Sequence, residues 1–166
     1  MGFLIARGAD PNATTGTDRY GTALAAAALQ GKTPAALLLL RSGAKPNIIS
    51  GYYGTALAAA SLCGNRDTVA SLLKCQYPGT EINVNAIGGH YGTALGAAFA
   101  AAEPFFTKIP PCVTLLLDHG ADINLVNCKY GSLLGKAVYE GNEKLVSLLL
   151  ASGADAFHVG GEYELA

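Results

Sequence analysis

Charged residues are scarce in this chain: only 14% of its 166 residues are Asp, Glu, Lys or Arg, against about a quarter in typical soluble domains. The 11 basic and 12 acidic residues nearly cancel, and no basic stripe runs along any segment. Nucleic-acid binding depends on such a stripe and has no electrostatic support here. Because 51% of the residues are hydrophobic, the chain can bury a core, and extensive disorder is not expected.

Long apolar runs are also missing. The richest run, Ala35 to Leu40, is far shorter than the ~18 residues of a membrane span. The start of the chain, "MGFLIARGADP", lacks the basic and long apolar regions of a signal peptide. Ala6 stands where a myristoylation signal starting at Gly2 needs Ser or Thr. We therefore expect no membrane association, and an intracellular, cytoplasmic protein.

Cysteine and histidine are few and poorly spaced for metal binding. The four cysteines, at 63, 75, 112 and 128, form no C-x-x-C pair, and no histidine lies at finger spacing from them. The pattern predicts free thiols in a reducing compartment. A metal site made of His90, His119 and His158 would need three distant segments to converge, so we expect no metal and no cofactor.

The chain is instead rich in repetition. "YGTALAAA" occurs at 20–27 and again at 53–60, and "YGTALGAA" occurs at 91–98. The tyrosines at 20, 53, 91, 130 and 163 are separated by 33, 38, 39 and 33 residues. A period of this size indicates a solenoid made of one repeated supersecondary unit.

Each unit has the same three parts. A helix of small residues, such as "ALAAAALQG", follows the tyrosine; a Leu-rich helix, such as "LVSLLLASG", comes next; a polar stretch that ends in Asn closes the unit. The predicted boundaries are a partial unit at 1–19, units at about 20–52, 53–90, 91–129 and 130–162, and the start of a further unit at 163–166.

Local signals support the helix pairs. Hydroxyl residues at 22, 55, 93 and 132 are placed to cap the first helices, and Gly43, Gly120 and Gly153 are placed to end the second ones. Apolar residues at helical spacing predict the core of the second helices. They are Val69, Leu72, Leu73, Val146, Leu149 and Leu150.

This pattern resembles the ankyrin repeat, whose signature is G-x-T-P-L-H-x-A-A-x-x-G, then V-x-x-L-L, then G-A-D-x-N. "TALAAAALQG" and "TALAAASLCG" match its first part. "GADPN" (8–12), "GAKPN" (43–47), "GADIN" (120–124) and "GADAF" (153–157) match its last part. The resemblance implies a mainly α solenoid of helix-turn-helix units joined by hairpin loops. It also implies protein–protein recognition without catalysis, through the hairpin tips and the concave face of the first helices.

The sequence departs from that signature in two ways. Alanine, glycine or leucine replaces its Pro (Ala23, Ala56, Ala94, Leu133) and its His (Ala25, Ala58, Gly96, Gly135), so the hydrogen bonds of that His must be absent or replaced. The "YGTAL" form resembles ankyrin arrays of filamentous fungi, which often lie downstream of NACHT-type NTPase domains. The chain itself has no G-x-x-x-x-G-K-[ST] nucleotide loop.

Candidate partner-binding residues lie at the predicted tips and in an insertion. The tip residues are Ile49, Ser50, Tyr52, His90, Val126 and Lys129. The insertion "EPFFTKIPP" carries Phe105 and Phe106, which either dock a partner or pack over the helix ends. A second insertion, "CQYPGTEI", lengthens the link after the second helix of its unit.

The sequence leaves two other functions open. An enzyme could pair Cys112 with His119 on one helix face, but Cys112 aligns with Leu145, a core position, which favours a buried structural cysteine. Alternatively, the chain is a structural segment of a longer array, stacked on flanking repeats. Its first residues read as a helix interior with apolar Phe3, Leu4 and Ile5, and its last residues begin a new unit.

Overall fold

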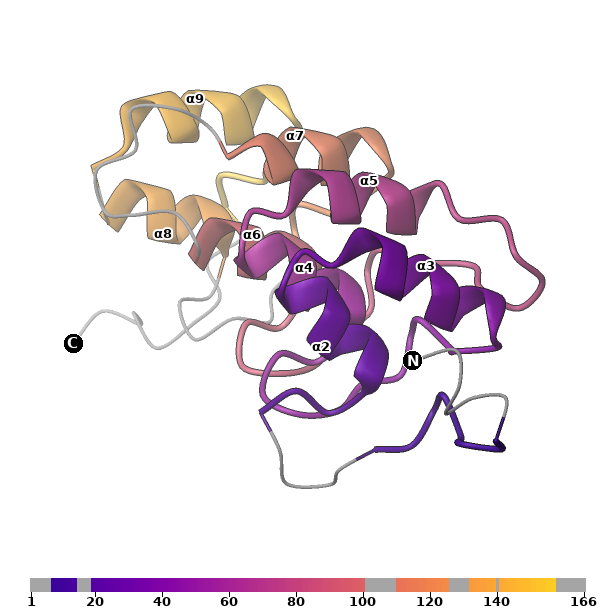
Figure 1. Ribbon diagram of the computed structural model, residues 1–166. Coiled ribbons are helices and arrows are strands. Elements are labelled where there is room, and N and C mark those ends of the chain that lie inside the picture. Colours follow the sequence, from indigo (N-terminus) through magenta and orange to yellow (C-terminus); the bar gives the residue numbers. More distant parts are fainter. Residues whose placement is uncertain (1–6, 15–18, 101–109, 126–131, 140, 158–166) are drawn as a thin grey trace.

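The computed structural model describes residues 7–14, 19–100, 110–125, 132–139 and 141–157 (Figure 1). The helices of these ranges follow one another in four pairs. They are α2 (Ala23–Leu29) with α3 (Thr33–Arg41), α4 (Ala56–Leu62) with α5 (Arg66–Leu73), α6 (Ala94–Ala100) with α7 (Pro111–Asp118), and α8 (Leu133–Tyr139) with α9 (Glu143–Ala151). We number them pair 1 to pair 4.

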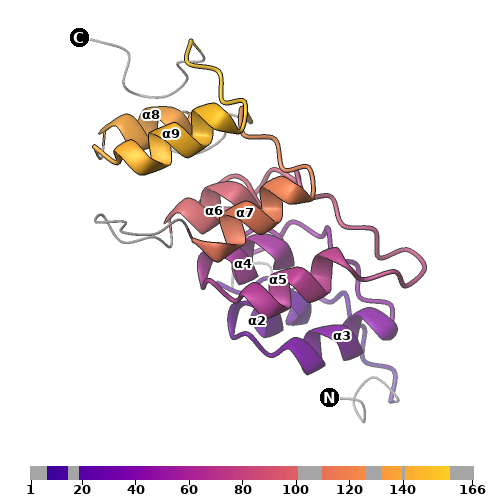
Figure 2. The same cartoon turned by 90° about the horizontal axis from the view of Figure 1, so that it is seen from above.

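The pairs stack in a row that is two helices thick. The first helices α2, α4, α6 and α8 form one layer, and the second helices α3, α5, α7 and α9 form the other (Figure 1). Figure 2 shows the row from above, with pair 1 at one end and pair 4 at the other. The prediction of a mainly α solenoid of helix-turn-helix units is confirmed.

The first helices begin where the hydroxyl residues predicted it. The side-chain oxygens of Thr22, Thr55, Thr93 and Ser132 each accept a hydrogen bond from the backbone N–H three residues later, at 3.0 to 3.1 Å. All four hydroxyl residues are less than 9% exposed. Each cap satisfies a buried donor that the helix itself leaves without a partner.

Alanine lets the first helices pack closely. Ala28, Ala59, Ala60, Ala97 and Ala98 are completely buried, because α4 lies between α2 and α6. Side chains of one carbon allow the backbones to approach without leaving a void.

The second helices supply the larger core residues. Val69, Leu72, Val113, Leu116 and Leu149 are at most 1% exposed. The prediction is wrong for Leu150, which is 46% exposed, and it overstates Leu73 and Val146, which are only partly buried. Leu150 lies on the outward side of the last pair, where the described chain places no further pair.

The loops also follow the predicted pattern. Gly43, Gly120 and Gly153 end the second helices with φ of +87°, +84° and +89°, a conformation that costs glycine little. Short hairpins precede the first helices: Ser50 pairs with Gly54, and the amide of Gly88 donates to the carbonyl of Gly92 at 2.7 Å.

The insertion after α5 folds back on pair 1. The hydroxyl of Thr80, which is 2% exposed, donates to the carbonyl of Tyr77 at 2.7 Å. The Nε of Arg41 in α3 donates to the hydroxyl of Tyr77, and the guanidinium carbon lies 5.5 Å from the centre of the tyrosine ring. The link therefore ties pair 2 to the second helix of pair 1.

Candidate functional site

Asparagine side chains join each unit to the next. Each Asn that closes a unit donates to a carbonyl of the following unit and accepts from an amide two residues beyond that carbonyl. Asn12 bonds Gly43 and Lys45, Asn47 bonds Glu81 and Asn83, Asn85 bonds Gly120 and Asp122, and Asn124 bonds Gly153 and Asp155, at 2.7 to 3.2 Å. We call this series the asparagine ladder. The recurrent Asn is visible in the sequence, but its role as a link between units was not predicted from it.

Backbone hydrogen bonds connect the hairpins themselves. The amide of Tyr52 donates to the carbonyl of Arg19 at 3.1 Å, and the amide of His90 donates to the carbonyl of Tyr52 at 2.8 Å. Successive hairpins therefore stack in register, with their tips in one line.

The glycine of the "YGT" sequence permits this stacking. Gly54 has a φ of +77°, and a Cβ there would lie 2.5 Å from the carbonyl oxygen of Gly88 in the next hairpin. Gly21 has a φ of +70°, and a Cβ there would lie 2.5 Å from the carbonyl oxygen of Ser50 in the next hairpin. Any side chain at these positions would separate the hairpins, which explains why the repeat places glycine directly before the capping Thr.

Four aromatic rings cluster at the tips of two hairpins. The ring of Tyr52 stacks on that of His90, with centroids 4.7 Å apart and planes at 16°. Tyr53 meets Tyr52 edge-on at 5.3 Å, and Tyr91 meets His90 edge-on at 5.0 Å. We call Tyr52, Tyr53, His90 and Tyr91 the tip cluster. The spacing of Tyr52 and His90 in the sequence does not predict that their rings stack; the register of the two hairpins places them side by side.

The tips present apolar surface to solvent. Ile49 is 54% exposed and Tyr52 is 44% exposed, while His90 is exposed and Ser50 is partly buried. Tyr20 and Ile87 are each 41% exposed and lie on neighbouring hairpins. These two were not predicted as site residues, although Ile87 occupies the position of Ile49 in the next repeat.

Four predicted site residues, Phe105, Phe106, Val126 and Lys129, lie outside the described residues. Their assignment stays a prediction.

The first-helix layer adds little accessible surface near the middle of the row. Residues 56 to 61 of α4 and 94 to 99 of α6 are all buried. A partner that approaches this layer can therefore contact mainly the hairpins beside it.

Cys112 and His119 lie at opposite ends of α7. Cys112 is completely buried in α7, and burial raises the pKa of its thiol, with the charge of Arg66 opposing this to a smaller extent. His119 is exposed at the end of the same helix, where its Nδ1 bonds the carbonyl of Leu115 at 2.8 Å. A buried thiol with a raised pKa is a poor nucleophile, so this pair does not form a catalytic site.

Cys63, Cys75 and Cys112 are free thiols. Among the described residues, His, Cys, Asp and Glu side chains form no group of three or more able to bind a metal ion. Nor does any described helix combine the length and hydropathy that crossing a membrane requires.

Comparison with known proteins identifies the repeat. The family model for ankyrin repeats, in three copies, matches residues 1–86, which is about half of the chain. A search of curated proteins found no match.

Proposed function

Since the chain belongs to the ankyrin repeat family, we propose that it is a non-catalytic module that binds another protein through its hairpin tips and the concave face of the first helices. Members of the family are generally protein-interaction modules. The observation that supports the tips most strongly is the tip cluster: the rings of Tyr52 and His90 are exposed, they stack on each other above the partly buried Tyr53 and Tyr91, and their hairpins are in register.

The chemistry of the tips suits an apolar partner surface. Tyrosine supplies a large contact area with few rotatable bonds, so little conformational entropy is lost on binding. The hairpin hydrogen bonds fix the rings before a partner arrives, which lowers the cost of binding further. Ile49 and Ile87 extend the apolar surface along the same line of tips.

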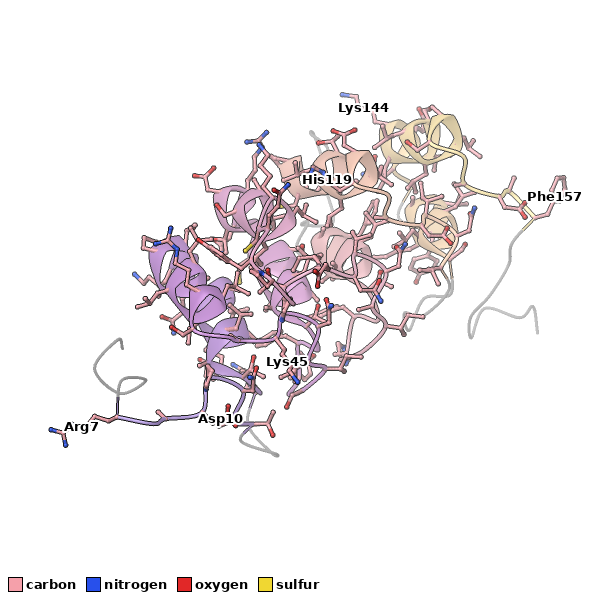
Figure 3. The ribbon with its side chains drawn as sticks, turned by 90° about the vertical axis from the view of Figure 1, so that its right-hand side faces the viewer. Arg7, Asp10, Lys45, His119, Lys144 and Phe157 are labelled. Atoms are coloured by element: carbon pink, nitrogen blue, oxygen red, sulfur yellow. The ribbon has the colours of Figure 1, made fainter. Side chains whose placement is uncertain are left out.

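Photocrosslinking tests this proposal. A photoreactive residue at position 49 or 52 should capture a partner protein, whereas the same residue at exposed Lys144, which Figure 3 places on α9 away from the hairpins, should not. Once the partner is identified, Tyr52→Ala combined with Ile49→Ser should weaken its binding at least tenfold while the circular dichroism spectrum stays unchanged. Equal affinity for the variant and the parent chain would refute binding at the tips.

One observation favours a second function, that of a structural segment in a longer array. The carbonyl of Gly8 and the amide of Asp10 occupy the positions at which Gly43 and Lys45 receive the ladder bonds of Asn12. An upstream unit that ends in Asn could therefore extend the asparagine ladder. The finer resemblance, to fungal arrays downstream of NACHT-type NTPase domains, belongs to this second proposal.

Adding an upstream repeat unit tests this second proposal. A copy of residues 12–42 placed directly before Gly8, so that its Asn precedes Gly8 by the same 31 residues that separate Asn12 from Gly43, should raise the free energy of unfolding. The matched control is the same extended chain with that Asn changed to Ala. Equal stability of the two extended chains would show that the upstream end does not accept a ladder bond.

A further inference from the structure

Arg19, Tyr52 and His90 are neighbours along the line of hairpin tips. Each residue directly precedes the tyrosine of its repeat unit, and all three are exposed. The amide of Tyr52 donates to the carbonyl of Arg19 at 3.1 Å, and the amide of His90 donates to the carbonyl of Tyr52 at 2.8 Å, so the hairpins hold these positions next to one another. We call Arg19, Tyr52 and His90 the tip column.

Each side chain of the tip column has a hydrogen-bond donor that is unused within the described residues. The guanidinium of Arg19, the hydroxyl of Tyr52 and the ring nitrogens of His90 form no hydrogen bond or ion pair there. Asp18, which precedes Arg19 in the sequence, lies outside the described residues. The stack of Tyr52 on His90 uses the faces of the two rings, whereas their polar groups bond at the ring edges, so the packed rings can still donate to a ligand.

Among the described residues, the hairpins and first helices carry no acidic side chain. Their basic residues are Arg19 and Lys136. The described Asp and Glu residues lie in the second helices or in the loops that close the units: Asp10, Asp67, Glu81, Asp118, Asp122, Glu143 and Asp155. The hairpin side of the described chain therefore carries only positive charge, and such a surface attracts anionic groups.

Exposed apolar side chains border the tip column. Ile49 is 54% exposed and Ile87 is 41% exposed, and they occupy the same position on the hairpins of Tyr52 and His90. Tyr20, which is 41% exposed, directly follows Arg19. A ligand that contacts the column therefore meets both hydrogen-bond donors and apolar surface.

We propose that the tip column binds a segment of the partner protein in which Asp or Glu residues lie beside apolar residues. This inference rests on the proposed binding at the hairpin tips and adds the chemistry of the partner. A carboxylate fits Arg19, because a guanidinium donates two parallel N–H bonds to the two carboxylate oxygens. The Tyr52 hydroxyl and the His90 ring donate to further oxygens of the segment, while its apolar side chains pack on Ile49 and Ile87.

Segments of other composition fit the column less well. The cations of a basic segment would approach the like charge of Arg19 and would find no carboxylate on the described hairpins. A wholly apolar segment would cover the donors of the tip column without bonding them, and burying unpaired polar groups is costly. The charge of the bound segment therefore distinguishes the proposal from its alternatives.

Selection from a phage-displayed library of random peptides tests the proposal. Peptides selected on the parent chain should be enriched in Asp and Glu relative to the unselected library. Arg19→Glu should remove this enrichment and favour Lys and Arg instead, because it reverses the charge of the column. Arg19 is exposed and its backbone carbonyl is retained in the variant, so the circular dichroism spectrum should not change.

Fluorescence anisotropy of one selected peptide measures the contribution of Arg19. Arg19→Glu should weaken its binding at least tenfold, and added salt should weaken its binding to the parent chain. The matched control is Lys144→Glu, which makes the same change in net charge on α9, away from the hairpins (Figure 3). This control should leave the affinity unchanged, and equal weakening by both variants would overturn the proposal.

Crosslinking separates this inference from the proposed function. A photoreactive residue at position 49 should crosslink the selected peptides. Peptides that crosslink there without enrichment in Asp and Glu would overturn the acidic segment and leave binding at the tips intact. Selected peptides that do not crosslink there would overturn both proposals. A selection that enriches no peptide would overturn the acidic segment.

Discussion

The joints between the helix pairs differ along the row. In the joints between pairs 1 and 2 and between pairs 2 and 3, the first helices lie closely side by side along their lengths. Between pairs 3 and 4 the helices make far fewer close approaches, and Figure 2 shows α8 and α9 set farther from α6 and α7. Phe99 of α6, at the position of Ala28 and Ser61, offers a reason, because a phenyl ring keeps the adjoining backbone at a greater distance.

The asparagine ladder does not follow this difference. Asn124 bonds pair 4 with the same two hydrogen bonds that Asn47 and Asn85 make at the closer joints. The polar connection of the units is therefore constant, while their apolar connection varies. In a repeat protein whose units contact only their neighbours, such variation sets which units unfold together. We expect pairs 1 to 3 to unfold as one unit and pair 4 to open more readily.

The largest effect is expected at the hairpins of the close joints. Gly54→Ala adds a methyl group 2.5 Å from the carbonyl oxygen of Gly88 and places alanine at a φ of +77°. The clash and the strained backbone together should lower the free energy of unfolding by about 3 kcal/mol or more. Urea denaturation at neutral pH measures this loss.

Gly64 provides the control for this variant. It has a φ of +64°, but a Cβ there would meet no atom within 4 Å. Gly64→Ala should therefore cost only the backbone strain, about 1 kcal/mol. If the two variants lost equal stability, hairpin stacking would not account for the glycine in "YGT".

A smaller difference in stability is expected between variants of Asn65 and Asn142, which occupy the same position in their repeats. The side-chain nitrogen of Asn65 donates to the carbonyls of Ala28 and Leu29 at 3.0 and 2.8 Å, across the joint between pairs 1 and 2. The side-chain nitrogen of Asn142 at the start of α9 is buried and has no hydrogen-bond partner among the described residues, although its oxygen accepts from the amide of Leu145 at 3.1 Å.

Changing each asparagine to aspartate tests this difference. Asn65→Asp turns two donors into a carboxylate facing two carbonyl oxygens and should cost about 2 kcal/mol. Asn142→Asp keeps the capping acceptor, removes the unpaired donor and adds a negative charge at a helix start, so it should be neutral or slightly stabilising. Thermal unfolding of the two variants gives the comparison, and a larger loss at position 142 would contradict it.

Removing single asparagines of the ladder should show which joint between pairs opens more readily. Asn47→Ala and Asn124→Ala each remove two exposed hydrogen bonds, worth about 1 kcal/mol together. Hydrogen exchange should show faster exchange in α8 and α9 alone for Asn124→Ala. Asn47→Ala should affect all of pairs 1 to 3, because they unfold together. Faster exchange throughout the chain in both variants would show that pair 4 is not a separate unit.

The sequence predicted the features that depend on local chemistry. The caps at Thr22 and Thr55 and the helix ends at Gly43 and Gly120 follow from hydrogen bonding and backbone conformation within a few residues. The repeat period then implied that these local units stack. Both steps needed only the residue types and their spacing.

The contacts between units could not be predicted in the same way. The stack of Tyr52 on His90 joins residues of different hairpins, and it depends on a register that the bond between Tyr52 and His90 sets. The exposure of Leu150 was missed because the repeat pattern treats every unit alike, whereas no described pair follows pair 4. Position within the row, which the pattern does not encode, determines what such residues contact.

An effect that is absent at neutral pH and grows only in alkaline solution is expected in the layer of second helices. Thr68 of α5 shares a hydrogen bond of 2.7 Å with Thr33 of α3, whereas the equivalent residue of α7 is Cys112, a buried thiol. Because burial raises the pKa of the Cys112 thiol, the folded chain keeps it neutral at a pH where the unfolded chain ionises it. The contribution of the neutral Cys112 thiol to stability is therefore complete below the ordinary thiol pKa of about 8.5 and is lost as the pH rises above that value.

Cys112→Val fills similar space without a titrating group. The stability difference between the parent chain and this variant should be constant at neutral pH and should then shift against the parent by up to about 1.4 kcal/mol per pH unit. Urea titrations in reducing buffer at several alkaline pH values measure this shift, and parallel curves for the two chains would show that Cys112 ionises as readily in the folded state as in the unfolded one.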